Sequence, residues 1–274
     1  MTTEPNASLF PSESEDIVRR IKARTPARLL AGRAGAAYRT ETQLDLREAH
    51  AAARDAVRTE LDLEGCFGAT FVEQWNLFEV CTMAATKDEY LLRPDLGRRF
   101  SEESRREITR LCSTGNQVQI VIGDGLSVTA VAAQVPRLLR LLFDGAKANG
   151  WKVGEPFLVR HCRVGVLNDI GELLAPEVAV LLIGERPGLA TAESLSAYLA
   201  YKPQNSHTDA NRNLISNIHD RGVSPQNAAA RILGLARQMM RAKESGCNLK
   251  EEFATLGQSQ PATLKPANER TPPS

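Results

Sequence analysis

Two apolar segments, each running into a glycine-containing loop, constrain the fold of this chain most. The first is Gln117-Val-Gln-Ile-Val-Ile-Gly-Asp-Gly-Leu-Ser127, and the second is Val178-Ala-Val-Leu-Leu-Ile-Gly-Glu-Arg-Pro-Gly188. Between them lie a helical pattern over residues 128–149 and a further strand over residues 157–166. Strand, loop, helix and strand in this order predict a βαβ unit, and therefore an α/β fold with a mostly parallel sheet flanked by helices.

The two glycine loops are a candidate ligand site. In parallel sheets, ligands bind outside the carboxyl ends of the strands, and both loops follow a strand directly. Glycine after a strand is also common in ordinary tight turns. The pattern alone leaves both interpretations open.

Length and charge exclude several classes of protein. A chain of 274 residues accommodates one large α/β domain, or one domain with a helical appendage. The net charge of +1 gives no electrostatic reason to expect nucleic acid or an anionic membrane as a partner. No run of eighteen apolar residues predicts a membrane span, and the polar N-terminus does not resemble a secretory signal.

Cysteine and histidine spacing predicts no metal site. The five cysteines are scattered and odd in number, which is typical of reduced thiols. No two of the four histidines lie three to five residues apart on one helix, so a local zinc motif is absent from the sequence.

Composition and periodicity divide the chain into four predicted regions. We expect a disordered lead over residues 1–13, a helical region with a short β-hairpin over 14–115, an α/β domain over 116–250 and a disordered tail over 251–274. The hairpin would pair residues 78–83 with residues 90–92. Residues 211–219 read as a polar connection with two apolar anchors.

Local signals place several helix ends. Ser14, Ser101, Ser127 and Ser224 are predicted N-caps, and Pro225 suits the first helical position. Pro136 is predicted to kink or split the long helix over residues 128–149.

Three known motifs for nucleotide, phosphate and cobalt binding can be compared with this sequence. Gly123-Asp-Gly125 opens like a dinucleotide fingerprint, but Val128 stands where the third glycine should be, and no phosphate-binding loop with lysine is present. Asn217-Ile-His219-Asp-Arg-Gly222 is one residue from the Asp-x-His-x-x-Gly pattern by which some cobalamin proteins supply a histidine to cobalt. Asn217 cannot polarise the imidazole as aspartate does, so we interpret His219 as a structural histidine.

A series of further motifs resembles a known family. Arg33-Ala-Gly, Arg93-Pro-Asp-Leu-Gly-Arg-Arg99, Gly123-Asp-Gly-Leu-Ser127, Val153-Gly-Glu-Pro-Phe, Gly184-Glu-Arg-Pro-Gly-Leu189, Glu193-Ser-Leu-Ser and Ile215-Ser-Asn-Ile-His219 occur in that order. This order resembles the small (light) subunit of ethanolamine ammonia-lyase, over roughly residues 15–250.

The resemblance implies a fold and an activity. It implies a subunit of an adenosylcobalamin-dependent lyase that converts ethanolamine to acetaldehyde and ammonia. The large subunit would be a TIM barrel that holds the substrate and most catalytic groups. This chain would cover the cofactor at the subunit interface with a Rossmann-like domain over residues 116–250, preceded by an N-terminal helical extension. It implies no catalytic residue and no metal ligand in this chain.

By position in the family, the resemblance implies three cofactor contacts. They are Val164, Glu185 and Leu214. Val164 would offer apolar surface and backbone groups to the corrin rim, and the Glu185 carboxylate would accept hydrogen bonds from cobalamin amides or its ribose hydroxyl. Leu214 stands where some members have cysteine, so a side-chain role there stays open beside backbone contacts to the cofactor.

Partners and location follow from the same resemblance. Arg33, Arg98 and Arg99 are candidates for docking or phosphate contacts, with solvated surface charge as an equal alternative. The polar N-terminus lacks the amphipathic helix thought to direct some members into a bacterial microcompartment. We therefore expect the bacterial cytoplasm, with the microcompartment as the family alternative. A purely structural partner that never touches the cofactor remains a rival hypothesis.

Overall fold

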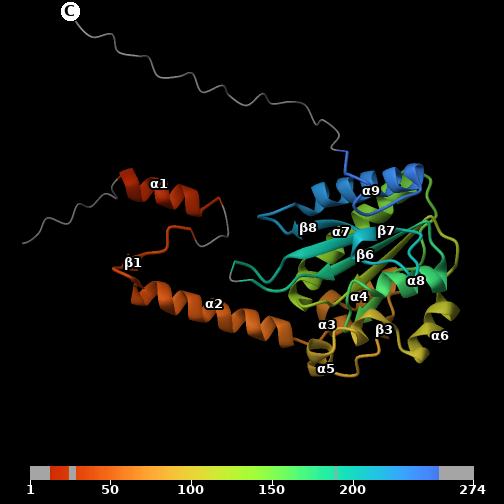
Figure 1. Ribbon diagram of the computed structural model, residues 1–274, viewed down its shortest axis with the longest axis horizontal. Helices are drawn as coiled ribbons and strands as arrows, with labels where there is room; N and C mark the ends of the chain where they lie inside the picture. The colour runs from red at the N-terminus through yellow and green to blue at the C-terminus, as the bar shows by residue number, and fades with distance from the viewer. Residues whose placement is uncertain (1–12, 25–28, 189, 253–274) are drawn as a thin grey trace, which may run out of the picture.

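The computed structural model is an α/β protein in which helices flank a mixed sheet, described over residues 13–24, 29–188 and 190–252 (Figure 1). The strands are β1 (Arg33–Ala34), β2 (Ala37–Tyr38), β3 (Glu79–Cys81), β4 (Val118–Gly123), β5 (Phe157–Arg160), β6 (Val178–Gly184), β7 (Leu195–Tyr201) and β8 (Asn213–Ile218). The α-helices are α1 (Glu13–Lys22), α2 (Thr40–Arg58), α3 (Leu63–Phe67), α4 (Ala69–Trp75), α5 (Lys87–Leu92), α6 (Glu102–Leu111), α7 (Val128–Ala148), α8 (Val166–Leu174) and α9 (Pro225–Ala242). Two short 3₁₀ turns are η1 (Leu96–Arg98) and η2 (Asp209–Asn211).

The main sheet has the strand order β3-β5-β4-β6-β7-β8. Strands β3, β5, β4 and β6 pair in parallel, whereas β7 runs antiparallel to both β6 and β8. The predicted βαβ unit is confirmed, because β4 and β5 are parallel neighbours joined through α7. From β5 the chain continues through α8 to β6, which lies on the other side of β4. The strand order therefore changes direction at β4.

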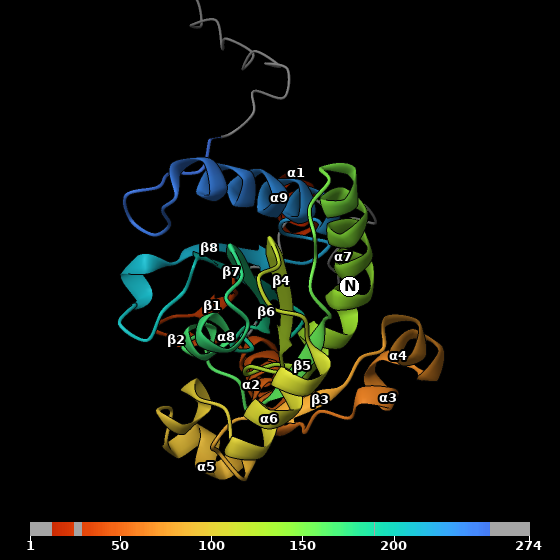
Figure 2. The same ribbon diagram turned by 90° about the vertical axis from the view of Figure 1, so that its right-hand side faces the viewer.

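Apolar side chains on both faces hold the sheet between helices. Every residue of β4 and β6 is buried, as expected for interior parallel strands. One cluster packs beneath α7 and α9, and a second packs beneath α6 and α8 on the opposite face. Figure 2 shows β3 and β8 at opposite ends of the sheet.

The helix α7 is continuous and contains Pro136. Its buried residues Val131, Val135, Leu138 and Leu142 follow a helical period and face the sheet. The predicted split at Pro136 is therefore wrong, since the buried face continues along both halves of one helix. A kink at this residue stays a prediction. The predicted caps Ser101, Ser127 and Ser224 are confirmed by hydrogen bonds from backbone N–H groups at the third following residue. Helix α1 instead begins at Glu13, which places Ser14 inside its first turn.

The elements α1, β1, β2 and α2 project from the rest of the molecule (Figure 1). Among their described residues none is buried, and α2 has no buried residue along its whole length. Apolar side chains such as Ile17, Leu30 and Leu44 are more than half exposed.

The predicted hairpin is wrong. Residues 87–92 form the helix α5 instead of a strand, because Thr86 caps its N-terminus and Asp88 and Glu89 fill its first turn. The preceding segment does contain a strand, β3, but this strand pairs in parallel with β5 in the main sheet.

Two further predictions need correction. The strand predicted over residues 157–166 ends at Arg160, and the helix α8 already begins at Val166. The polar connection over residues 211–219 contains the strand β8. Its two buried anchors, Ile215 and Ile218, are three residues apart, so they do not alternate as in a regular strand. A register shift opposite Leu195 and Ala197 allows both to reach the core.

The remaining predictions concern the cysteines, membrane-spanning helices and the boundaries of the four regions. All five cysteines are free thiols. Among the described helices, none has both the length and the apolar character that a membrane span requires. The lead up to residue 12 and the tail from residue 253 lie outside the described residues, and the boundary between residues 115 and 116 stays a prediction.

Candidate functional site

The two glycine loops meet at the carboxyl edge of the sheet. The Leu126 N–H donates to the Gly184 carbonyl oxygen at 3.0 Å. Gly125 has a φ of +57°, and a Cβ atom built on it would lie 2.3 Å from that oxygen. The glycines therefore allow backbone to pack against backbone. The first loop is almost entirely buried, so it works as a tight structural turn, while the second loop leaves Glu185 partly accessible.

Asp124 joins three segments beneath these loops. Its carboxylate accepts hydrogen bonds from the N–H groups of Cys162 at 2.8 Å and His161 at 2.9 Å. The Lys87 ammonium lies 3.3 Å from the same carboxylate, and Asp124 has no exposed surface. His161 adopts a φ of +55°, which turns the chain sharply after β5. Sequence reasoning missed this role, although an acid between two glycines after a buried strand was a visible signal.

Glu185 connects β6, β7 and β8 through its carboxylate. Oε2 accepts a hydrogen bond from the Ser194 hydroxyl at 2.7 Å. Oε1 accepts from the Ser196 hydroxyl at 2.5 Å and from the Asn217 N–H at 2.9 Å. A carboxylate offers about four acceptor positions. Donors among the described residues thus use three of these positions, and one on Oε2 has no such donor.

Leu214 lies on the sheet face that carries Tyr198. The two residues are register partners in β8 and β7, and Leu214 is 46% exposed. Burial raises the pKa of the Tyr198 hydroxyl, and the negative charges of Glu185 and Asp209 raise it further. Tyr198 therefore lies within electrostatic reach of Glu185, so apolar and polar groups share this face.

Val164 lies in the loop between β5 and α8. It is half-buried and packs against the cluster beneath α6 and α8, to which Tyr198 also contributes. The next residue, Gly165, lines a pocket of about 290 Å³ together with Arg98, Arg99 and Arg212. Arg212 precedes Leu214 by two residues, so this pocket lies beside two of the three predicted cofactor contacts.

The predicted arginines separate into two places. Arg98 and Arg99 both line this pocket. Arg33 instead lies in β1 of the projecting region, with its guanidinium 5.0 Å from the centre of the Tyr38 ring. The structure does not bring Arg33 to the same pocket.

His219 is buried and hydrogen-bonded through both ring nitrogens. Nε2 lies 2.8 Å from the Asn217 side-chain oxygen, and Nδ1 accepts from the Arg221 N–H at 3.3 Å. His219 is thus packed and hydrogen-bonded as predicted, and Asn217 contacts the ring where the cobalt-binding pattern has aspartate. Its purely structural role stays a prediction. In the part of the chain that the structure describes, no cluster of three or more His, Cys, Asp or Glu side chains is arranged to hold a metal ion.

Comparison with known proteins gives one family. The model of the ethanolamine ammonia-lyase light chain matches residues 15–250. The ethanolamine ammonia-lyase small subunits of Clostridium perfringens and Clostridioides difficile are each 46% identical to this chain, over 84% of it and 76% of the relative. The small subunit of Clostridium acetobutylicum is 40% identical over 86% of this chain and 95% of its own length.

Proposed function

Since the chain belongs to the ethanolamine ammonia-lyase light-chain family, we propose that it is the small subunit of an adenosylcobalamin-dependent lyase that converts ethanolamine to acetaldehyde and ammonia. The observation that carries this proposal is 46% identity over 84% of the chain to small subunits of this enzyme. Most catalytic groups would belong to the large subunit, with which this chain forms a hetero-oligomer. Its own part is to bind and orient the cofactor at the interface.

The residues around Leu214 fit an amphipathic ligand such as a corrin with amide side chains. Leu214 is an exposed leucine on a sheet face, and Val164 offers half-buried apolar surface nearby in the fold. Glu185 retains one acceptor position for an amide or hydroxyl donor. We propose Val164, Glu185 and Leu214 as the residues that hold the cofactor. The chemistry supplied by adenosylcobalamin when bound is radical generation by homolysis of its cobalt–carbon bond.

Glu185 also positions the surroundings of the cofactor in this proposal. By binding Ser194, Ser196 and the Asn217 N–H, its carboxylate fixes the start of β7 against the end of β8. These contacts define the edge of the face on which Leu214 lies. One residue would thus bind the cofactor directly and hold the backbone around it.

The variant Glu185→Ala tests the proposal. In the complex with the large subunit, we expect cobalamin affinity to fall by about 1–3 kcal/mol, or about 5- to 150-fold, because a carboxylate is lost and two hydroxyls and one N–H lose their acceptor. The measurement is titration of the complex with cobalamin, followed by visible absorption.

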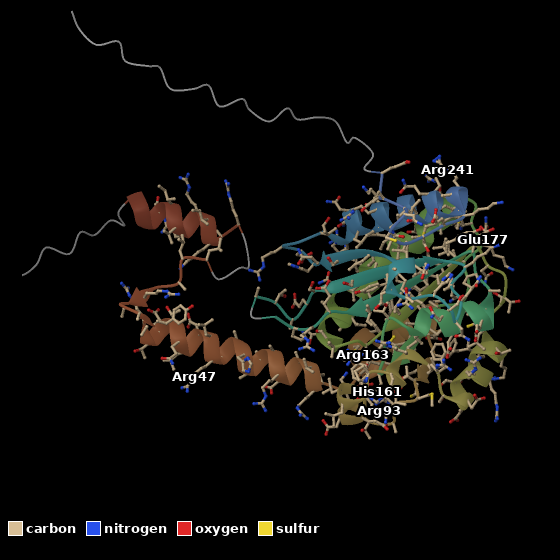
Figure 3. The ribbon with its side chains drawn as sticks, in the orientation of Figure 1. Arg47, Arg93, His161, Arg163, Glu177 and Arg241 are labelled. Carbon is tan, nitrogen blue, oxygen red and sulfur yellow. The ribbon has the colours of Figure 1, made fainter. Side chains whose placement is uncertain are left out.

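The variant Glu177→Ala is the matched control. Glu177 directly precedes β6, at the opposite end of that strand from Glu185 (Figure 3). Its removal should leave affinity unchanged. Unchanged affinity for Glu185→Ala, with assembly intact on gel filtration, would favour a structural partner that does not touch the cofactor.

We further propose that the sheet and its helices form a Rossmann-like cobalamin-binding domain, with the region before it as an N-terminal helical extension. The reversal of chain direction at β4 supports the first part, and the exposure of α2 supports the second. The proposed location is the bacterial cytoplasm, with a bacterial microcompartment as the family alternative. Co-purification of the native enzyme with a protein shell would favour the microcompartment.

A further inference from the structure

The pocket beside Val164 is built from three separate segments. Arg98 and Arg99 come from the end of η1, Gly165 comes from the start of α8, and Arg212 comes from the connection between β7 and β8. The pocket has a volume of about 290 Å³. This is enough for a small polar group and far too little for a corrin ring, so any ligand group that enters it is a part of something larger or a small ion.

Positive charge exceeds negative charge in this pocket. Three guanidinium groups face two carboxylates, and both carboxylates already have partners. Asp169 lies 3.0 Å from the Arg105 guanidinium, and it accepts a hydrogen bond from the Phe100 N–H at 2.9 Å. Asp209 pairs with Arg212. Across the described residues, the side chains of Arg98 and Arg99 have neither a hydrogen-bond nor an ion-pair partner.

Arg212 is buried with incomplete hydrogen bonding. Its side chain is only 4% exposed, and it donates to the Asn168 side-chain oxygen at 2.9 Å as well as pairing with Asp209. Its Nε atom is buried without a partner among the described residues. A buried guanidinium is costly unless its donors are satisfied. Arg212 also lines the pocket, where an anion would add a further acceptor for a guanidinium whose side-chain partners among the described residues are Asn168 and Asp209.

Arg98 is held close to Arg212. The carbon stem of Arg98 crosses Gly165, where a Cβ atom would lie 2.8 Å from Arg98 Cγ. Burial lowers the pKa of Arg212, and the positive charge of Arg98 lowers it further. The two like charges repel each other, and an anion bound between them would attract both and so offset that repulsion.

We propose that this pocket is a subsite for a phosphate group, and that in the assembled enzyme it takes the phosphodiester of the cobalamin nucleotide tail. Arginine is suited to this role because its planar guanidinium donates two parallel hydrogen bonds to phosphate oxygens. The proposal rests on the function proposed above. It extends the site from Val164 and Leu214 to Arg98, Arg99 and Arg212.

Two corrinoids that differ by one phosphate test the proposal. Adenosylcobinamide has the corrin ring without the nucleotide, and adenosylcobinamide phosphate adds only the phosphate group. Each is titrated into the complex of this chain with its large subunit, and binding is followed by visible absorption. The test variant is Arg98→Met, which keeps the stem that packs on Gly165 and removes the charge.

The unchanged complex is expected to bind the phosphate-bearing corrinoid about tenfold or more tightly, which is the range for charge-assisted hydrogen bonds. In Arg98→Met this preference should fall to about twofold or less, with affinity for plain cobinamide unchanged. Arg98→Lys should restore part of it. The matched control is Arg241→Ala. Arg241 is an exposed arginine on α9, which covers the opposite face of the sheet. In Figure 3 it lies far from Arg163, whose N–H donates to the carbonyl oxygen of Gly97, the neighbour of Arg98.

Three results would overturn the proposal. Equal binding of both corrinoids by the unchanged complex would exclude a tail subsite, and direct binding of inorganic phosphate under those conditions would assign the pocket to the free ion. The same preference in Arg98→Met as in the unchanged complex would place the phosphate elsewhere. Failure of the complex to bind cobinamide and cobalamin alike would refute the proposed function itself, which none of the three results above would do.

Discussion

Asp124 shows how one residue fixes the geometry of the carboxyl edge. A single buried carboxylate accepts hydrogen bonds from two consecutive backbone N–H groups after β5 and pairs with Lys87 from α5. Those N–H groups belong to the turn that leads to Val164. The position of a proposed cofactor contact thus depends on an acid that does not itself reach the surface.

Replacing this acid should be strongly destabilising. In Asp124→Ala, two N–H groups and a buried ammonium lose their acceptor, and we expect the free energy of unfolding to fall by about 3–5 kcal/mol. Urea denaturation followed by tryptophan fluorescence measures the loss. A fall of less than about 1 kcal/mol would show that water replaces the carboxylate without cost.

The double variant Lys87→Met with Asp124→Ala separates the two contributions. It should be less destabilised than the sum of the single variants, because the ammonium is no longer buried without a partner. Strict additivity would mean that Lys87 gains nothing from Asp124, despite the distance of 3.3 Å between them.

The role of a single residue was predictable from the sequence where it depends only on neighbouring residues. Ser101, Ser127 and Ser224 cap helices as their side-chain chemistry requires. The partners of Glu185 were not predictable, because Ser194 and Asn217 come to it through strand pairing far along the chain. Nor could charge spacing show that Arg98 and Arg212 share a pocket.

At the scale of elements, the helix α5 shows where a pattern misled. Tyr90-Leu-Leu reads as a strand, but Tyr90 is buried and donates its hydroxyl to the Cys162 carbonyl oxygen at 3.0 Å. A cap at Thr86 and acids in the first turn were the better signal. In β8, the register shift hides the strand, because it changes the spacing of the apolar anchors from two residues to three.

The projecting elements α1, β1 and β2 should contribute little to the stability of the rest. Their described residues bury no side chain, so deletion of residues 1–39 should change the free energy of unfolding by about 0.5 kcal/mol or less. Urea denaturation compares the shortened and full chains. The contrasting variant is Ile232→Ala within α9, where loss of a core side chain should cost about 2–5 kcal/mol. A loss of that size on deletion would mean that this region packs on the body in solution.

At the β7–β8 end of the sheet, a helix covers one face and the other face is exposed. Helix α9 packs over β7 and β8, whereas Leu214 and Ser216 on their opposite face are exposed. Beside that face lie Glu185, Val164 and the arginine pocket. We propose that this surface is one half of the cofactor site and that the large subunit supplies the other half.

The parallel core of the fold was predictable from the sequence because strand, loop and helix follow one another locally around β4. The mixed character of the sheet was not, because the antiparallel pairing of β7 depends on contacts across the whole domain. Likewise, the family resemblance implied Val164, Glu185 and Leu214, but only the fold shows that they lie after β5, after β6 and within β8.

Cobalamin retention after gel filtration tests the central claim most directly. The chain alone and the chain co-expressed with its large subunit are each loaded with cobalamin, separated by size, and examined by visible absorption. We expect retention in the complex but not in the isolated chain, together with ammonia release from ethanolamine by the complex. Tight retention by the isolated chain would contradict the interface account and reopen His219 as a ligand, and no retention by either would refute cofactor binding.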